Sequence, residues 1–198
     1  WTGLLSGNTS SFLTKLYAEK KYNRELFVER ESLTRELDSF LDSDTSIFPL
    51  LGEAGQGKTT QLCYWTETLS DEDCGVMIFS GSEFAGITLE YKLKHSFGWA
   101  AHKPVSGLVK SLADAAMSRG KKVLILIDAI NECIEYPGLI SSTEGPLMLF
   151  RDLYRLFIDS GYNCFKILFT CRNYTWKNII MPEASRKDQS VFYNSGTE

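Results

Sequence analysis

Apolar and polar residues alternate along this chain in two different periods, which indicates that strands and helices follow one another. Short apolar runs of strand length are separated by longer stretches with helical spacing. The expected strands are 46–51, 74–80, 123–127 and 166–170, and the expected helices are 11–20, 30–41, 58–69, 89–99, 106–119 and 146–160. This order predicts an α/β fold of three layers, in which a mostly parallel sheet is flanked by helices.

Two of these runs predict where their strands lie in the sheet. The run 123–127 (VLILI) is aliphatic throughout, which is typical of a strand buried on both faces of a parallel sheet. The run 46–51 contains Pro49, and proline suits an edge strand or a strand start because it has no backbone N–H to donate. We therefore expect the 123–127 strand to be buried on both faces, whereas Pro49 weakens the prediction of a strand at 46–51 without removing it.

A phosphate-binding pattern directly follows the first expected strand. The chain reads GEAGQGKTT there, which completes G-x-x-x-x-G-K-[ST]. The glycines allow turns closed to other residues, so successive backbone N–H groups can surround phosphate oxygens. Lys58 is expected to reach the β- and γ-phosphates, and Thr59 to place its hydroxyl on Mg²⁺ at the start of the next helix. The expected nucleotide-binding residues are Gly52, Glu53, Ala54, Gly55, Gln56, Gly57, Lys58, Thr59 and Thr60.

An acidic residue stands at the end of the central strand. Asp128 follows the run 123–127 directly, at the carboxyl end where ligands bind in open α/β sheets. In phosphate-loop enzymes an acid in this position holds the magnesium ion. The alternative is that Asp128 only caps the next helix. Because the phosphate loop lies upstream, we expect Thr59 and Asp128 to form a magnesium site.

The strand 166–170 also ends in polar side chains, among them Arg172. A guanidinium offers a planar fork of donors and stays charged, so it suits contact with a γ-phosphate. Spacing alone leaves a surface arginine as an equal alternative.

The segments GEAGQGKTT, VLILIDAINE and ILFTCR together resemble the STAND class of signal-transduction ATPases, most closely its NACHT branch. The resemblance spans about residues 27–173. It implies ATP or ADP with Mg²⁺ as the bound cofactor. It also implies that Asp128 holds Mg²⁺, that Glu132 polarises the attacking water and that Arg172 reads the γ-phosphate. Asn131 stands where the family often has a further acid.

The resemblance also implies a base pocket upstream of the phosphate loop. The stretch FVERESL is similar to the segment that packs against adenine in STAND proteins, which makes Phe27 and Val28 candidates for that contact. Glu29 replaces the glycine common there. The family normally continues into a helical lid and a winged-helix domain, and its effector domain is separate.

The chain divides into three expected regions. Residues 1–26 read as a helical lead or linker, 27–180 as the NACHT-like nucleotide-binding domain, and 181–198 as a polar tail leading to a lid. The chain lacks an initiator methionine, so we expect a nucleotide-binding domain excised from a longer protein. The lid, winged-helix and effector domains would then lie outside it, as partners. The resemblance further implies a nucleotide-dependent homo-oligomer and a role in innate-immune or cell-death signalling.

Composition narrows the class of protein. The 198 residues, 43% hydrophobic, suffice for one sizeable core. A net charge of −4 gives no electrostatic reason to expect nucleic acid as the main partner. No apolar stretch approaches the roughly 18 residues of a membrane span, and no signal peptide is recognisable, so a cytoplasmic location is expected. The five cysteines form no C-x-x-C pair, which favours buried reduced thiols over a zinc site.

Several functions fit a phosphate loop, and turnover would separate them. The leading expectation is a slowly hydrolysing ATP-dependent switch. An AAA-type machine would cycle steadily and would need an arginine finger, for which Arg151, Arg155 and Arg186 are available. A nucleotide-binding scaffold would not hydrolyse at all. A small-molecule kinase receives no support from the DAINE segment, and a GTPase is disfavoured because no N-K-x-D follows a strand.

Overall fold

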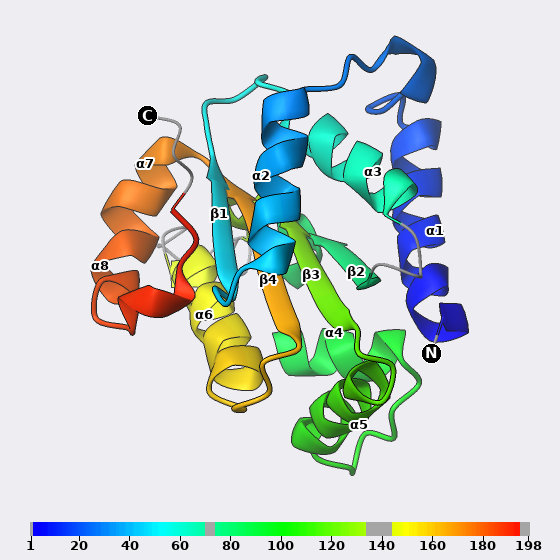
Figure 1. The fold of residues 1–198 in the computed structure, drawn as a ribbon, viewed down its shortest axis with the longest axis vertical. Coiled ribbons are helices and arrows are strands. Elements are labelled where there is room, and N and C mark those ends of the chain that lie inside the picture. The colour runs from blue at the N-terminus through cyan, green and yellow to red at the C-terminus, as the bar shows by residue number, and fades with distance from the viewer. Residues whose placement is uncertain (1, 70–73, 134–143, 195–198) are drawn as a thin grey trace.

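The computed structural model describes residues 2–69, 74–133 and 144–194 as a sheet between two layers of helices (Figure 1). Its strands are β1 (Ile47–Leu51), β2 (Cys74–Ser80), β3 (Lys122–Asp128) and β4 (Phe165–Cys171). Its α-helices are α1 (Thr2–Ala18), α2 (Glu31–Asp42), α3 (Lys58–Thr68), α4 (Leu89–Ser96), α5 (Val105–Met117), α6 (Glu144–Leu153), α7 (Asn173–Thr175) and α8 (Met181–Ala184). Short 3-10 turns lie at Arg24–Leu26, Gly81–Phe84, Ile130–Glu132 and Gln189–Val191, and π turns at Tyr154–Ile158 and Trp176–Ile180.

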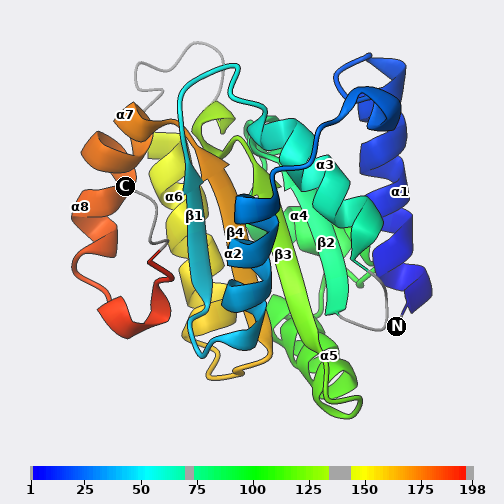
Figure 2. The same ribbon diagram turned by 45° about the horizontal axis from the view of Figure 1, so that its top comes forward.

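The four strands form one parallel sheet in the order β1-β4-β3-β2. The register places Ile125 of β3 beside Met77 of β2 and Ile167 of β4. The predicted α/β class and parallel sheet are therefore confirmed, with 123–127 inside a central strand. Because all strands run the same way, their carboxyl ends meet at one end of the sheet (Figure 2).

Alternate residues of the central strands face different helical layers. On β3, Val123, Ile125 and Ile127 belong to the core that includes α4, α5 and α6, whereas Leu124 and Leu126 belong to the core that includes α2 and α3. Asp128 continues the second set, because side chains alternate with a period of two along a strand. The strand therefore directs its terminal carboxylate toward the layer of α3.

Helix α1 packs along β2, the strand at one edge of the sheet. The helix begins at Thr2 and is longer than the expected 11–20 stretch. Its side chains reach both cores, and the backbone N–H of Ile78 donates to Asn8 Oδ1 at 2.7 Å. An edge strand presents unpaired backbone groups that need such cover. The helix thus supplies a partner for the outer side of β2.

The opposite edge strand, β1, is flanked by residues 191–193. Tyr193 N donates to Ile47 O at 2.7 Å, and Ser46 N donates to Val191 O at 2.7 Å. Pro49 lies two residues beyond Ile47 and faces the same outer side, where a missing N–H removes no bond to β4. The strand expected at 46–51 is therefore present, and it lies at an edge of the sheet, where proline is tolerated. The domain boundaries at 27 and 180 stay predictions, although segments on both sides of them pack on the sheet.

A buried lysine joins α2 to the sheet. Lys166, on β4, is only 2% exposed, and its Nζ donates to Phe40 O at 3.0 Å, to Ser43 O at 2.6 Å and to Thr45 O. The last carbonyls of a helix lack partners within it, so an ammonium at this end satisfies them. Burial lowers the pKa of Lys166 to about 8, with the nearby charge of Lys122 acting in the same direction. This contact fixes α2 on the sheet.

Helical structure continues after β4, where the sequence indicated none. Residues 173–184 form α7, a π turn and α8. Trp176, Ile180 and Ala184 are spaced four apart and are half-buried or buried. This helical period was present in the sequence but was too short to stand out. None of the helices that the structure describes is long and apolar enough to cross a membrane. Residues 195–198 of the expected tail lie outside the described residues.

Candidate functional site

The phosphate loop connects β1 to α3 at the carboxyl end of the sheet (Figure 2). Gly55 and Gly57 have φ of 79° and 73°, a left-handed conformation that favours glycine. At Gly52 the constraint is contact, since a Cβ atom there would lie 2.3 Å from Gln56 Oε1. Gln56 Oε1 also accepts from Glu53 N at 2.8 Å, which closes the loop upon itself. The backbone therefore needs glycine at 55 and 57, whereas at 52 the atom in the way is the end of the flexible Gln56 side chain.

Lys58 lies across its own loop. Its Nζ donates to Gly52 O at 2.8 Å and to Glu53 O at 2.7 Å. Burial lowers the pKa of Lys58, while the charge of Asp128 opposes that effect. The ammonium thus sits beside the first turn of α3, where an anion would also meet backbone N–H groups.

Asp128 joins α3 to β3 and β4 through hydrogen bonds from two threonines. Thr59 Oγ1 donates to its Oδ1 and Oδ2 at 3.1 and 2.9 Å, and Thr170 Oγ1 donates to Oδ1 at 2.9 Å. Thr170 Oγ1 in turn accepts from Ala129 N at 2.6 Å. The carboxylate is 7% exposed and binds residues far away in sequence. These contacts favour the metal-site interpretation of Asp128 over the helix-capping alternative.

The Thr59–Asp128 pair has the donor chemistry that Mg²⁺ requires. Burial raises the pKa of Asp128, and the two threonine hydrogen bonds act against that rise. A carboxylate in such surroundings is stabilised by a cation. The donors are a hydroxyl and carboxylate oxygens, which suit a hard cation that completes its shell with water and phosphate. Among residues 2–69, 74–133 and 144–194, no cluster of three or more His, Cys, Asp or Glu competes with this pair as a metal site.

A cavity of about 330 Å³ brings the three sequence motifs together. Its lining includes the phosphate loop, Asp128, Glu132 and Arg172. Glu132 and Arg172 are exposed at this cavity, so both can reach a bound molecule. The full lining is Lys21, Ala54, Gly55, Gln56, Gly57, Lys58, Thr59, Thr60, Asp128, Ala129, Asn131, Glu132, Thr170 and Arg172. Gly52 and Glu53 contribute through the carbonyls that hold Lys58.

Four members of this lining were not singled out as site residues from the sequence: Lys21, Ala129, Asn131 and Thr170. Asn131 Oδ1 accepts from Arg172 N at 3.2 Å, so Asn131 ties the turn after β3 to the end of β4. Lys21 enters from the segment after α1, distant from every motif. Helical and strand periods carry no signal for such contacts. Only the tertiary arrangement identifies them.

The structure does not bring the expected base-contact residues into this cavity. The Phe27 ring stacks on Tyr64, with centroids 4.7 Å apart and planes at 26°. Val28 is 82% exposed, and neither residue lines the 330 Å³ cavity. Arg30, from the same stretch, instead donates from Nη2 to Gln56 O at 2.7 Å. Adenine contact by Phe27 and Val28 stays a prediction.

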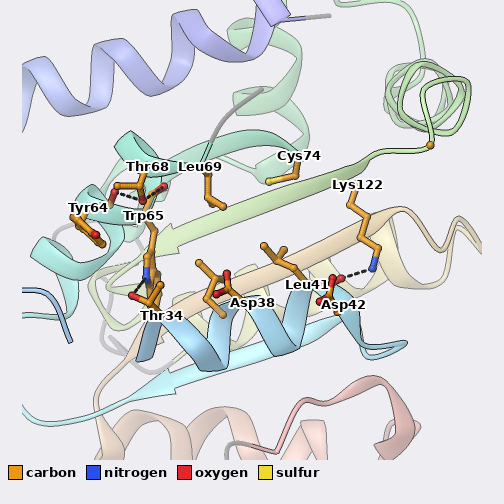
Figure 3. Close-up of a pocket in the computed structure, with 12 residues that line it drawn as sticks. Thr34, Asp38, Leu41, Asp42, Tyr64, Trp65, Thr68, Leu69, Cys74 and Lys122 are labelled. Carbon is orange, nitrogen blue, oxygen red and sulfur yellow. Dashed lines mark hydrogen bonds between the residues drawn. The ribbon is translucent and has the colours of Figure 1, made fainter. Parts of the chain in front are cut away.

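A larger cavity, of about 600 Å³, lies between α2 and α3 (Figure 3). Its walls include Leu37, Leu41 and Trp65, whose Nε1 donates to Thr34 Oγ1 at 3.4 Å. Cys74 and Lys122 also line it, and both begin their strands, so it lies toward the amino ends of the sheet. It contains no residue of the phosphate loop. The larger of these two cavities is therefore not the one that the phosphate loop lines.

No family model matches this chain, and no curated protein matches it. Among solved structures, the chain is similar to one described as a DNA replication initiation factor, with a TM-score of 0.45 and 19% sequence identity. The match covers 88% of this chain and 49% of that chain, so this chain spans about half the length of that protein. A likeness of this extent identifies no activity, substrate or partner. The parallel sheet and the phosphate loop themselves give the chain a P-loop NTPase-like fold.

Proposed function

We propose that this domain binds a Mg²⁺–nucleoside triphosphate in the 330 Å³ cavity and slowly hydrolyses its β–γ bond. The observation that carries the proposal is the contact between Thr59 and Asp128. A hydroxyl at the start of α3 and a carboxylate at the end of β3, 69 residues apart in sequence, meet at 2.9 Å. This pairing is the one a magnesium site of the phosphate-loop kind needs.

The lining residues have distinct roles in the proposed reaction. Backbone N–H groups of the loop would surround the phosphate oxygens, and Lys58 would exchange the carbonyls of Gly52 and Glu53 for those oxygens. Bound Mg²⁺ would neutralise charge that develops on the phosphates. Glu132 would orient the attacking water and accept its proton. Arg172 would hold the γ-phosphate with its planar fork of donors.

We expect slow turnover because the side chains of Glu132 and Arg172 are both exposed. Glu132 and Arg172 are both exposed at the cavity, which leaves the water between them open to solvent. Hydrolysis is accelerated mainly by fixed positioning and by exclusion of competing water. We expect a rate below about one per second in the absence of a partner.

The biological use of hydrolysis is a separate proposal. The resemblance of the three motifs to STAND ATPases of the NACHT branch supports a signalling switch that prefers adenine, in innate-immune or cell-death signalling. In such a switch the γ-phosphate biases the arrangement of neighbouring domains, and hydrolysis resets it. The lid and winged-helix domains would be the elements that respond.

An AAA-type machine is the second candidate, and three surface arginines are available as its arginine finger. Arg151 and Arg186 lie 3.0 and 3.9 Å from carboxylate oxygens of Glu183, and Arg155 lies 3.1 Å from Asp152. Exposed ion pairs contribute little, so each arginine can move to a neighbouring subunit's γ-phosphate. A machine predicts that turnover rises with protein concentration and falls in one arginine variant. A switch predicts neither effect.

The first experiment identifies the nucleotide. The purified chain is denatured, released nucleotides are identified by mass spectrometry, and binding of Mg²⁺ complexes of ATP, ADP and GTP is measured by calorimetry. Lys58→Ala is the test variant, and Lys110→Ala is its control because Lys110 pairs only with Asp114 on a surface helix. We expect ATP to bind the wild type and the control at least about 100-fold more tightly than Lys58→Ala. Equal affinity in all three would overturn the proposed site.

A further inference from the structure

The turn that ends α1 fixes the backbone of Lys21. Lys20 has a left-handed φ of 53°, its N–H donates to Tyr17 O at 3.0 Å, and Lys21 N donates to Leu16 O at 2.9 Å. These two bonds form a Schellman motif, with lysine in the position that glycine usually takes. The motif sets the direction in which the chain leaves the helix. Lys21 is the first residue beyond that turn.

Anchors on both sides hold this turn against α3. The hydroxyls of Tyr17 and Tyr22 donate to the two carboxylate oxygens of Glu67, at 2.6 and 2.7 Å. Leu16 and Tyr22 are buried in the core on the α3 side of the sheet. Lys21 therefore projects from a segment clamped to the helix that begins at the phosphate loop. Its place near the cavity is set by tertiary contacts and not by a free loop.

The side chain of Lys21 lines the same cavity as Asp128, Glu132 and Arg172. Its ion pair with Glu19 raises the pKa of Lys21 most, and the charges of Glu132 and Asp128 add to that effect. The positive charge of Lys21 therefore interacts with the carboxylates of Glu132 and Asp128 at one end of the cavity. The terminal phosphate of a bound triphosphate would lie at that end. A cation there would complement the charge that distinguishes a triphosphate from a diphosphate.

The partner that Lys21 has in this structure can be exchanged. Lys21 Nζ lies 2.8 Å from Glu19 Oε2, and the two side chains are 64% and 37% exposed. A pair so open to water contributes little to stability. A phosphate offers more charge and more acceptor oxygens than one carboxylate.

Resting on the proposed function of this cavity, we propose that Lys21 leaves Glu19 to bind the γ-phosphate and makes the site selective for triphosphate over diphosphate. Lys58 serves both nucleotides, because it reaches the β-phosphate as well. Lys21 serves the triphosphate alone. The end of α1 therefore contacts the nucleotide only when a triphosphate is bound.

The test compares affinities for Mg²⁺–AMP-PNP, a non-hydrolysable triphosphate, and Mg²⁺–ADP by calorimetry. Lys21→Gln should weaken AMP-PNP binding about tenfold and ADP binding less than about twofold. Glu19→Gln should tighten AMP-PNP binding about twofold to threefold, because Lys21 is released from its pair. Lys20→Gly is the matched control: it removes one positive charge from the adjacent residue, retains the left-handed turn, and should change neither affinity.

Each other outcome identifies what fails. If Lys21→Gln weakens both nucleotides equally, or neither, Lys21 does not contact the γ-phosphate and the inference is overturned while the site stands. A tenfold loss in Lys20→Gly would show a general effect of charge and overturn it likewise. Lys21→Arg keeps the cation and should retain most of the triphosphate selectivity, provided circular dichroism shows it folded. Binding of neither nucleotide by the wild type would overturn the proposed function itself.

Discussion

Gly81 lies directly against Ala129, the residue that follows the candidate magnesium ligand. A Cβ atom placed on Gly81 would lie 2.1 Å from Ala129 O, well inside van der Waals contact. Ala129 has a left-handed φ of 52°, a conformation that costs a non-glycine residue about 1 kcal/mol or more. Such strain persists only where neighbours hold it in place. The turn after β2 is therefore part of what positions Asp128.

Gly81→Ala should destabilise the fold by about 2–3 kcal/mol, because the new methyl group meets backbone that has to shift. Mg²⁺-dependent ATP binding should weaken with it, since the turn after Asp128 moves. Gly7→Ala is the control, because a Cβ atom there meets nothing within 4 Å and alanine favours the interior of α1. Urea denaturation of both variants measures the difference. Equal stabilities would show that the Gly81 contact is absent.

Asp128→Asn should make the nucleotide-free domain more stable while abolishing its response to magnesium. Burial raises the folded-state pKa of Asp128 above its ordinary value, so stability falls as the pH rises through that interval. Asparagine keeps the Oδ1 that accepts from both Thr59 and Thr170 and removes the buried charge. We expect a gain of about 1 kcal/mol at pH 8. Thermal melts with and without Mg²⁺–ATP measure both effects, and a less stable variant without nucleotide would contradict the prediction.

Glu132→Gln should preserve nucleotide binding and remove hydrolysis. The amide has the size of the carboxylate but cannot accept a proton from water. Conversion of bound ATP to ADP in a single turnover, followed by acid quenching, is the appropriate measurement, since product release does not limit it. Glu25→Gln, a matching change outside the cavity lining, should leave the rate unchanged. An unaffected rate in Glu132→Gln would assign the base to another residue.

Gln61→Met should stabilise the domain by about 1–2 kcal/mol. Gln61 is 0% exposed on α3, and within the described part of the chain neither of its side-chain amide atoms has a hydrogen-bond partner. Methionine has nearly the same length and no polar group to desolvate. Gln189→Met is the comparison, because Gln189 Nε2 donates to Ala184 O and Lys187 O and those bonds would be lost. Destabilisation by Gln61→Met, measured in urea, would reveal a hidden partner.

The contribution of Lys166 should make stability rise with pH above neutrality. Burial lowers its folded-state pKa to about 8 from the usual 10.5 of lysine, so the unfolded chain holds more protons between these values. The stability that Lys166 contributes is therefore fully present above its pKa in the unfolded chain, and it is lost as the pH falls through 8. The free energy of unfolding is measured from pH 7 to 10.5 for wild type and Lys166→Met, and the wild type should gain relative to the variant. Lys177→Met, a change at an exposed lysine, is the control, and parallel curves for wild type and Lys166→Met would refute the shift.

Local patterns predicted the parts of this fold that depend on short segments. The phosphate loop needs left-handed glycines at 55 and 57 for its own backbone, so it could be read directly. Pro49 only weakened the prediction of a strand that the structure places at the edge of the sheet. The β3 strand and Asp128 followed from an aliphatic run that ends in a carboxylate. These features are encoded within about ten residues of one another.

Local patterns could not predict features that depend on contacts between residues far apart in the sequence. The apolar neighbours of Lys166 predict a strand but not the partners of its ammonium, because the carbonyls it satisfies belong to the end of α2 and the turn after it. Lys21 reaches the cavity only because Tyr17 and Tyr22 are held by Glu67 on α3. Asn131 gains its role from Arg172, which lies 41 residues away.

The cover on both edge strands limits how this domain can meet other proteins. Asn8 of α1 takes a backbone donor of β2, and Val191 and Tyr193 take the outer groups of β1. These two segments therefore hinder a second chain from adding a strand to either edge of the sheet. Contacts between copies would then involve helices and loops. The two covering segments lie on opposite flanks of the molecule (Figure 1). A fragment trimmed to residues 27–180 would lose both covering segments and expose both edge strands. Insolubility of that fragment would therefore not count against the fold.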